Sequence, residues 1–346
     1  MTAAKRHMNL KQLADHLGLS QATVSRALNG YPGARPQTRE KVLAAAEQFG
    51  YEPNAIARGL ATGRSGNIGL VFPVGSSLLL DPHFLEFLVG ATEFGATRDM
   101  SINLSAPAPG DEISKYSRMT RSRQADGFIV NGPVLDDPRV ALLRGMNVPF
   151  VLHGRCEVDL PHAWIDIDNE GAFRRAASLL IGFGHRRIIL LGAPGHFTFA
   201  VHRARGFRAA HAEHGLAADE RLMFNQPMTE EVGYRLIMQL MAATPRPTAI
   251  VCSSMITALG ALRALGDARL SVPRDCSVIA HDDVFPYISA ESMRPALTTT
   301  RSPIRLHGRR AAQILTGIAD RAIDPHFHEM IDVELVVRDS TGPVPG

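Results

Sequence analysis

The first fifty residues carry apolar side chains at the i, i+3, i+4 spacing of three short amphipathic helices. Gly18 ends the first helix, Ser20 is a favourable N-cap for the second, and the third runs from about Pro36 to Gly50. The positions predicted to face inward are Leu13, Ala14, Leu17, Val24, Ala27, Leu28, Val42, Ala45, Ala46 and Phe49. Short helices whose first two members are joined by a tight glycine-containing turn form the pattern of a helix-turn-helix.

From Ile68 onward the pattern changes to short apolar runs that alternate with amphipathic stretches. One series contains GLVFPV, INLSA, GFIVNG, VPFVLH and WIDID, and a second contains RRIILLGA, LMFNQ, TAIVCS and SVIAHD. Such alternation predicts βα units, in which a parallel sheet carries helices on both faces. Two successive series predict two sheets with a cleft between them, because open parallel sheets bind ligands at the carboxyl ends of their strands.

Composition and charge place the excess of cations in the first predicted unit. The 346 residues are 45% apolar and 21% charged, which allows a large core and one small extra domain. The net charge is +3, but residues 1–66 hold nine Lys or Arg and four Asp or Glu, whereas the remainder holds 28 and 30. Positive charge on a helix-turn-helix is expected where a protein neutralises DNA phosphates. A solvated basic surface is the alternative interpretation of such an excess taken alone.

Membrane, secreted and disulfide-bonded classes are not indicated. No apolar run reaches the ~18 residues that span a bilayer, and the start lacks the apolar segment of a secretory signal, so a cytoplasmic protein is expected. A sugar-binding protein for transport would need that signal and no helix-turn-helix. Cys156, Cys252 and Cys276 have neither disulfide nor zinc-ligand spacing and are expected to be small buried residues.

Enzyme motifs are missing as well. The sequence contains no GxSxG, no HExxH, no complete GxGxxG and no GxxxxGK followed by Ser or Thr. His326 and His328 would share one face of a strand, but two ligands without a third make a poor metal site. We therefore expect a protein that is not an enzyme, with no catalytic residues, no metal and no cofactor.

The strings LKQLADHLGLSQATVSRALNG and GYEPNAIARGL resemble the lac repressor (LacI/GalR) family of bacterial regulators, and the resemblance recurs at GHRRIILLG, ALTTTRSP and ELVVRDSTGP. It covers nearly the whole chain. It implies an all-α helix-turn-helix headpiece and an α/β core of two doubly wound parallel-sheet subdomains, similar to periplasmic sugar-binding proteins. The implied divisions are a headpiece at 1–53, a hinge helix and linker at 54–66, and a core at 67–346, with one subdomain at 67–166 and 297–327 and the other at 167–296 and 328–340.

The second helix would read DNA, because its outward positions match the base-reading positions of the family. Gln21 can pair with an adenine edge, Arg26 can pair bidentately with guanine, and Ala22 can contact a thymine methyl group. An ordinary solvated helix surface is the alternative interpretation of these positions. The resemblance implies DNA contacts by Leu10, Lys11, Gln21, Ala22, Thr23, Ser25, Arg26, Asn29, Thr38, Asn54, Ala57 and Leu60.

Two further segments bear on DNA contact. Thr38 and the amides at the start of the third helix would hold phosphates, although Arg35 replaces the small hydroxyl residue that is usual in the family at that start. Leu60 matches a leucine that wedges into the minor groove. Its short segment, with Gly59 inside it, is expected to become helical only on DNA. A surface linker with an incidental leucine is the alternative.

The core would bind a small effector. Arg203 matches a ligand-binding arginine of the family, and Asp283, the second acid of SVIAHDD, matches a carboxylate at the carboxyl end of a strand. Phe84 matches an apolar residue that packs on the ligand. Trp164 could stack on a pyranose ring. The alternative interpretations are structural: a turn for the acidic pair, and core packing for Trp164. The implied effector-binding residues are Phe84, Trp164, Arg203, Ser254 and Asp283.

The identity of the effector is the part that the resemblance leaves open. Ser254-Met255 replaces the usual Asn-Asp pair, and His153-Gly154 stands where many relatives have an aliphatic residue and an Asp, so a pocket with fewer carboxylates and amides is predicted. The preferred hypothesis is a repressor released by a sugar, such as an α-glucoside, and the alternative is a purine or other non-sugar corepressor. The expected partners are pseudo-palindromic double-stranded operator DNA, a small-molecule effector, and a second copy in a homodimer or a tetramer, without a membrane.

Overall fold

The computed structural model describes residues 8–29, 33–51, 63–72, 82–282, 285 and 287–344. The chain divides into two compact units, Met1–Ser65 and Gly66–Gly346. Most of the predicted hinge, with Asn54, Ala57 and Leu60, lies outside the described residues. No helix within the described ranges is both long and apolar enough to cross a membrane.

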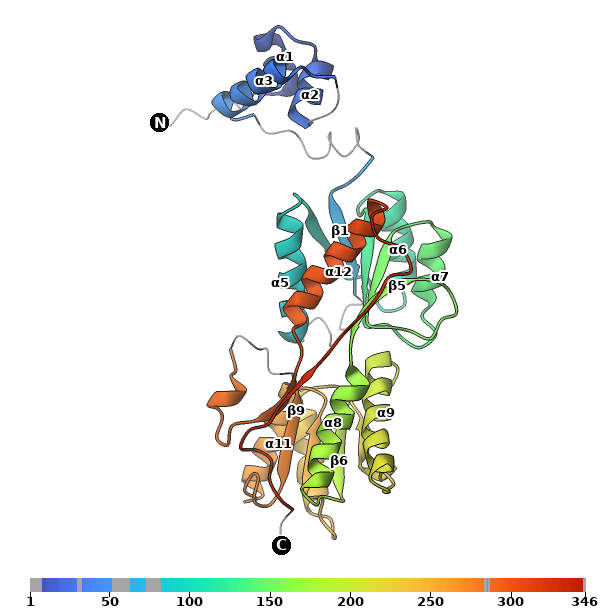
Figure 1. The fold of residues 1–346 in the computed structure, drawn as a ribbon, viewed down its shortest axis with the longest axis vertical. Coiled ribbons are helices and arrows are strands. Elements are labelled where there is room, and N and C mark those ends of the chain that lie inside the picture. The colour runs from blue at the N-terminus through green and yellow to red at the C-terminus, as the bar shows by residue number, and fades with distance from the viewer. Residues whose placement is uncertain are drawn as a thin grey trace. The chain divides into compact units, whose positions relative to one another are not determined.

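The described part of the first unit forms three helices: α1 (Leu10–Leu17), α2 (Gln21–Asn29) and α3 (Pro36–Phe49) (Figure 1). Their bounds confirm the helix-turn-helix pattern. The buried core consists of Leu13, Ala14, Val24, Ala27, Val42, Ala45 and Ala46, all of them positions predicted to face inward. The remaining predicted positions, Leu17, Leu28 and Phe49, are partly buried against this core.

Local capping explains the short turn between α1 and α2. Asn9 and Gln12 form a capping box at the start of α1, with both hydrogen bonds at 2.9 Å. Gly18 ends α1 in the left-handed conformation, with φ of 62°. The Ser20 hydroxyl then accepts a hydrogen bond from the Thr23 amide at 3.1 Å, so α2 begins at the residue after Ser20.

In the described part of the second unit, the first sheet has six parallel strands in the order β11-β5-β4-β3-β1-β2. The strands are β1 (Asn67–Val71), β2 (Ser101–Ser105), β3 (Gly127–Asn131), β4 (Phe150–His153), β5 (Ala163–Ile167) and β11 (His328–Ile331). Helices α5 (Pro82–Ala96) and α12 (Ile304–Ala319) cover one face, and α6 (Glu112–Arg121) and α7 (Pro138–Gly145) cover the other (Figure 1).

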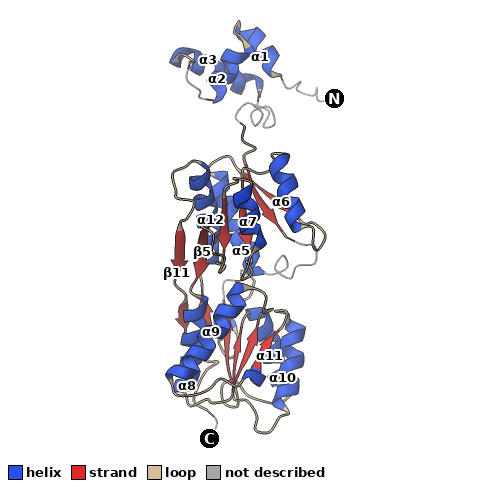
Figure 2. Ribbon diagram, turned by 90° about the vertical axis from the view of Figure 1, so that its right-hand side faces the viewer, coloured by secondary structure: helices blue, strands red, loops and turns tan. Residues whose placement is uncertain are grey.

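The second sheet, within the same described ranges, has the order β12-β10-β9-β8-β6-β7, with β12 antiparallel and the others parallel. Its strands are β6 (Ile188–Gly192), β7 (Met223–Asn225), β8 (Ala249–Cys252), β9 (Ser277–His281), β10 (Thr298–Arg301) and β12 (Glu334–Val336). Helices α8 (Asn169–Gly182) and α9 (Thr198–Glu213) cover one face, and α10 (Glu230–Met241) and α11 (Met255–Asp267) cover the other (Figure 2). Short 3₁₀ turns occur at Glu220–Leu222 and Ala290–Ser292.

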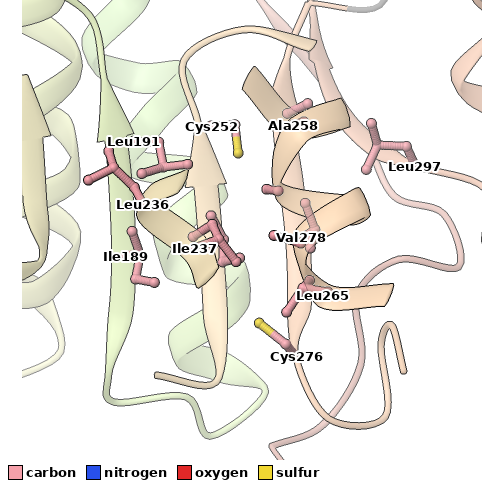
Figure 3. Close-up of a cluster of buried hydrophobic side chains, with 14 of the residues drawn as sticks. Ile189, Leu191, Leu236, Ile237, Cys252, Ala258, Leu265, Cys276, Val278 and Leu297 are labelled. Carbon is pink, nitrogen blue, oxygen red and sulfur yellow. The ribbon is translucent and has the colours of Figure 1, made fainter. Parts of the chain in front are cut away.

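Residues of the predicted apolar runs form the core under α10 and α11. Ile189, Cys252 and Val278 come from three neighbouring strands, and Ile237 and Leu265 from the covering helices meet them (Figure 3). Cys252 and Cys276 are buried free thiols, as expected, but Cys156 is only half-buried, which corrects that part of the expectation.

Two predicted subdomain boundaries are wrong. Residues 298–301 pair with β9 in the second sheet, not with the first subdomain, because Thr298, Thr299 and Thr300 are buried between β9 and β12. After β10 the chain crosses from the second sheet to the first at Pro303, whose nitrogen cannot donate a hydrogen bond to a strand. Residues 328–331 pair with β5 in the first sheet, so the last crossing lies between β11 and β12.

Helices α5 and α12 approach each other at backbone contact distance. A Cβ atom on Gly308 would lie 1.8 Å from the Phe87 carbonyl oxygen, and one on Gly90 would lie 1.8 Å from the Arg305 carbonyl oxygen. These glycines therefore set the spacing of the two helices on one face of the first sheet.

We predict that Gly308→Ala destabilises the core by about 1 to 3 kcal/mol or more, because the backbone of α5 cannot move out of the way cheaply. The control is Gly266→Ala in α11, where no atom of the described residues lies within 4 Å of the added Cβ. There alanine should stabilise by about 0.5 to 1 kcal/mol, since it restricts the unfolded chain. Thermal unfolding of both variants checks this, and equal unfolding temperatures would refute the close approach.

Candidate functional site

A pocket lies where the carboxyl ends of the two sheets meet, as the alternating pattern predicted. The space between its walls, counted together with the open solvent at its mouth, is about 770 Å³. The first sheet and its helices contribute His83, Phe84, Asn131, His153 and Asp166. The second sheet, its helices and the loops after its strands contribute Asn169, Phe199, Arg203, Ser253, Ser254, His281 and Asp282.

Arg203 is a buried cation in the pocket wall, on α9, and 6% of its surface is exposed. Its Nε donates to Asn169 Oδ1 at 2.8 Å, and its Nη1 donates to the Ser253 carbonyl oxygen at 2.8 Å. The guanidinium carbon also lies 4.8 Å from the centroid of the Phe199 ring. These contacts hold the planar group in one orientation, which suits directional hydrogen bonds to a ligand.

Asp166 connects the first sheet to that arginine. Its Oδ1 accepts hydrogen bonds from the Ile167 amide at 2.8 Å and from Asn169 Nδ2 at 3.2 Å, and Arg155 forms an ion pair with Oδ2 at 3.3 Å. Burial raises the pKa of Asp166 to about 6, against the opposing effects of Arg155 and the Ile167 amide. A chain of contacts thus runs from Asp166 through Asn169 to Arg203.

Asp282 binds groups from both sides of the pocket. It follows β9 in the left-handed conformation, with φ of 64°. Its Oδ2 accepts from Ser302 Oγ and from His83 Nε2 on α5, both at 2.5 Å. Burial favours the neutral acid, but the charge and hydrogen bond of His83, with Ser302, hold the pKa of Asp282 well below its usual range. Its Oδ1 is buried without a hydrogen-bond partner in the described residues, and a ligand hydroxyl could satisfy it.

Two histidines add neutral polar groups. Burial, with Arg203 nearby, lowers the pKa of His281 well below its usual value, and burial, with His307 nearby, does so for His153. His281 Nδ1 lies 2.7 Å from Thr300 Oγ1, while its Nε2 has no hydrogen-bond partner in the described part of the chain. His153 Nδ1 donates to Asn131 Oδ1 at 2.5 Å. Neutral imidazoles can both donate and accept, which suits hydroxyl groups.

Phe84, Arg203 and Ser254 line the pocket, so the fold brings three of the expected effector residues together. Ser254 also caps α11 by accepting from the Thr257 amide at 3.2 Å. Asp283 lies outside the described residues, and its neighbour Asp282 lines the pocket.

Trp164 does not line the pocket, which corrects that expectation. Its ring stacks on His328, with centroids 4.6 Å apart, and packs against the core under α6 and α7. Trp164 precedes Asp166 by two residues on β5, which places it about 7 Å further from the carboxyl end of the strand.

Carboxylates and amides other than the expected effector residues also line the pocket. Asp166 and Asp282 supply carboxylates, and Asn131 and Asn169 supply amides. Sequence reasoning missed these residues, although Asn131 ends the run GFIVN and Asp166 lies in the run WIDID. Their positions at the carboxyl ends of strands were the available signal.

The first unit presents a separate polar surface on α2. Gln21, Ala22 and Arg26 are exposed, whereas Val24 and Ala27 on the opposite side are fully buried. Among the remaining predicted DNA contacts, Lys11 is exposed and Leu10, Thr23, Ser25 and Thr38 are half-buried.

Some of these predicted contacts are engaged within the first unit. The Thr23 hydroxyl lies 2.9 Å from that of Ser20, and Leu10 packs against the helical core. Arg35 provides no side-chain cap for α3. Asn29 is the last residue of α2.

Comparison with known families gives one match within each of the two units. Residues 9–54 match the bacterial regulatory proteins of the lacI family, and residues 177–341 match a periplasmic binding protein-like domain. The chain is 44% identical over 340 residues to the HTH-type transcriptional regulator AglR of Rhizobium meliloti, covering 98% of this chain and 95% of the relative. It is 36% identical over 276 residues to the regulator RafR of Escherichia coli, covering 80% and 82%.

Two solved structures superimpose on nearly the whole chain. The complex of the transcriptional regulator CelR with cellobiose superimposes with a TM-score of 0.72 at 29% identity, covering 96% of this chain and 99% of that one. The lac repressor dimer bound to operator and the anti-inducer ONPF superimposes with a TM-score of 0.83 at 24% identity, covering 97% and 100%. The second likeness establishes the shared fold, including the helical headpiece and the two-sheet core.

We predict that Asp166→Asn changes how stability depends on pH. A carboxyl whose pKa rises on folding costs stability as pH increases from about 4 to about 6, because the unfolded chain ionises first. Relative to wild type, the variant should therefore gain about 2 to 3 kcal/mol across this range. Urea unfolding between pH 4 and pH 7 measures the gain. Asp136→Asn, which removes a charge from an exposed position, is the control, and a gain independent of pH would contradict the assignment.

Proposed function

The chain belongs to the lacI family of bacterial regulatory proteins, and from that premise we propose that it represses transcription at a pseudo-palindromic operator until a sugar bound in the pocket releases it. The observation that carries the proposal is the combination of an exposed helix-turn-helix face with a pocket whose walls come from both sheets. As a member of this family it is a DNA-binding transcriptional regulator, and its relatives AglR and RafR are also transcriptional regulators.

The exposed face of α2 supports sequence-specific reading. Arg26 offers a bidentate donor for guanine, and Gln21 offers a donor and an acceptor for adenine. Both project from a helix whose opposite face is buried in its own small core, so their backbone positions are well defined. The DNA contacts proposed for the hinge remain Asn54, Ala57 and Leu60.

The chemistry of the pocket supports a sugar. Sugars present many hydroxyl groups that both donate and accept, and the pocket offers a buried guanidinium, two carboxylates, two amides and neutral imidazoles. Phe84 and Phe199 supply apolar surface for the C–H faces of a pyranose ring. The similar regulator CelR was solved with the disaccharide cellobiose. We propose an oligosaccharide effector, with an α-glucoside as the first candidate.

An exposed apolar strip supports a homodimer. Leu85 and Val89, one turn apart on α5, are 48% and 37% exposed, and Leu306 at the start of α12 is 50% exposed. Neighbouring apolar side chains of this kind often mark an interface between copies. A two-fold dimer would place two headpieces on two half-sites, which is why the operator should be a pseudo-palindrome.

The experiment that tests the proposal is selection of duplexes from random-sequence DNA by the full-length protein. We expect a pseudo-palindrome whose half-sites lie about 10 bp apart. The recovered duplex is then titrated in the presence of maltose, sucrose, cellobiose, raffinose or guanine. Release by one of the sugars supports the proposal, whereas an asymmetric site, or a response to guanine alone, would overturn it.

We predict that Arg26→Ala loses about 1 to 3 kcal/mol at one base pair of the selected site and accepts other bases there, because one bidentate contact disappears. Gln21→Ala, on the same exposed face, should relax a different base pair. Binding to all single-base variants of the duplex measures both effects. Equal weakening of specific and non-specific DNA by Arg26→Ala would show that Arg26 contacts only phosphates.

We predict that Arg203→Ala binds the operator duplex normally but loses about 1.5 to 3 kcal/mol of sugar affinity, because a charge-assisted hydrogen bond is removed. The variant should stay on DNA at sugar concentrations that release the wild type. If the ligand is a corepressor, the variant should instead fail to bind DNA tightly when the ligand is present. Calorimetry and operator titration distinguish these results.

Arg208→Ala is the matched control, because Arg208 lies on the same helix and faces outward in an ion pair with Glu220. It should respond to the sugar like the wild type. A folded Arg203→Ala protein with wild-type sugar binding would remove Arg203 from the site.

A further inference from the structure

One end of the first sheet carries cations without acidic partners. The segment 115–123, KYSRMTRSR, contains four basic residues and no acid, and it covers the second half of α6 and the turn after it. Arg98, in the turn between α5 and β2, lies at the same end of the sheet. We call Arg98, Arg118, Arg121 and Arg123 the basic edge; all four are exposed.

The basic edge differs from most of the remaining core surface. Exposed arginines elsewhere are commonly paired with acids, as Arg208 is with Glu220 at 2.7 Å and Arg263 is with Glu230 at 2.7 Å. No residue of the basic edge forms an ion pair in the described part of the chain, and Arg118 Nη1 instead donates to Ser114 Oγ at 2.9 Å. The carboxylates at this end of the sheet include Asp99 and Asp126, and Asp126 Oδ2 accepts from the Gly66 amide at 2.8 Å. The cations outnumber these two acids.

The connection to the first unit enters the core at this same end. Gly66 is hydrogen-bonded to both neighbouring segments, because its carbonyl oxygen accepts from the Ser101 amide at 2.9 Å and its amide donates to Asp126. Strand β1 starts at the next residue, and Asn67 Nδ2 donates to the carbonyl oxygen of Gln124, three residues after α6, at 3.2 Å. Residues 52–65, which precede this point, can span at most about 50 Å even when fully extended. The helix-turn-helix is therefore tethered within about 50 Å of this end of the core, which allows DNA bound by it to reach the basic edge.

We propose that the basic edge contacts phosphates of the DNA that flanks each operator half-site. This inference rests on the proposed function and adds a second DNA-contacting surface, on the core. Phosphate contacts add affinity without reading sequence, and each released counterion makes binding more dependent on salt. Cations further than about 8 Å from the DNA are screened at physiological ionic strength, so only a surface close to the DNA has this effect.

The test compares two double variants that remove the same charge from different places. R121Q/R123Q removes one exposed helical arginine and one arginine with φ of 51° from the basic edge. R235Q/R269Q likewise removes one exposed helical arginine and one arginine with φ of 57°, but from the subdomain of the second sheet. Full-length proteins are titrated with the selected duplex, carrying either flanks of about 15 bp or no flanks, between about 50 and 300 mM NaCl.

On the long duplex, R121Q/R123Q should show a salt slope smaller in magnitude than that of the wild type by about 0.9 for each phosphate that the variant no longer neutralises. A slope smaller by about 0.9 corresponds to an affinity about eightfold lower at 0.1 M salt, so a decrease of at least that size is expected. On the duplex without flanks the two proteins should have equal slopes. R235Q/R269Q should match the wild type on both duplexes, and thermal melts of all three confirm folding.

Several results would overturn the inference while leaving the proposed function intact. These are a wild-type slope for R121Q/R123Q on the long duplex, a slope difference that persists without flanks, and an equal decrease in R235Q/R269Q. The last result would mean that overall charge, not position, sets the salt dependence. If the wild type does not prefer the selected duplex over a scrambled one, the proposed function itself fails and this inference fails with it.

Discussion

The chain crosses between two parallel sheets three times within the described residues, after β5, after β10 and after β11, and this connectivity makes the pocket. Because each sheet is almost entirely parallel, its carboxyl ends gather at one edge, and the crossings bring those two edges together. Residues that end strands far apart in the sequence, such as Asn131 and His281, therefore line the same pocket. Both sheets are linked through it, since Asp282 on one side holds His83 on the other.

Electrostatics inside the pocket depends on local partners more than on residue type. Asp166 and Asp282 are both buried carboxylates, yet their pKa values move in opposite directions. Burial dominates at Asp166, whose Arg155 partner is 3.3 Å away, whereas His83 and Ser302 approach Asp282 to 2.5 Å. The pocket thus combines strong fixed charges with neutral imidazoles. That mixture supports the proposed effector, a neutral molecule with many hydroxyl groups, because an anion would meet both carboxylates.

Cations are used in three ways in this chain. Arg203 is buried and oriented by an amide and a carbonyl group, which suits ligand recognition. Arg208 and others on the core surface are neutralised by acids. Arg26 and the basic edge are exposed, and we propose that both contact DNA. The overall charge of +3 conceals this division.

The sequence alone determined the element types, the two-sheet core and the helix-turn-helix, because apolar periodicity, glycine stops and caps such as Ser20 act over a few residues. It also identified Phe84, Arg203 and Ser254 as pocket candidates through a family resemblance. It could not show that Trp164 lies below the pocket, that Asp166 and Asn131 line it, or that residues 298–301 and 328–331 belong to the opposite sheets. Those outcomes depend on strand pairing and on side-chain contacts between residues far apart in the sequence, such as His83 and Asp282. Only the tertiary structure decides which distant residues meet, because local pattern carries no information about register between segments.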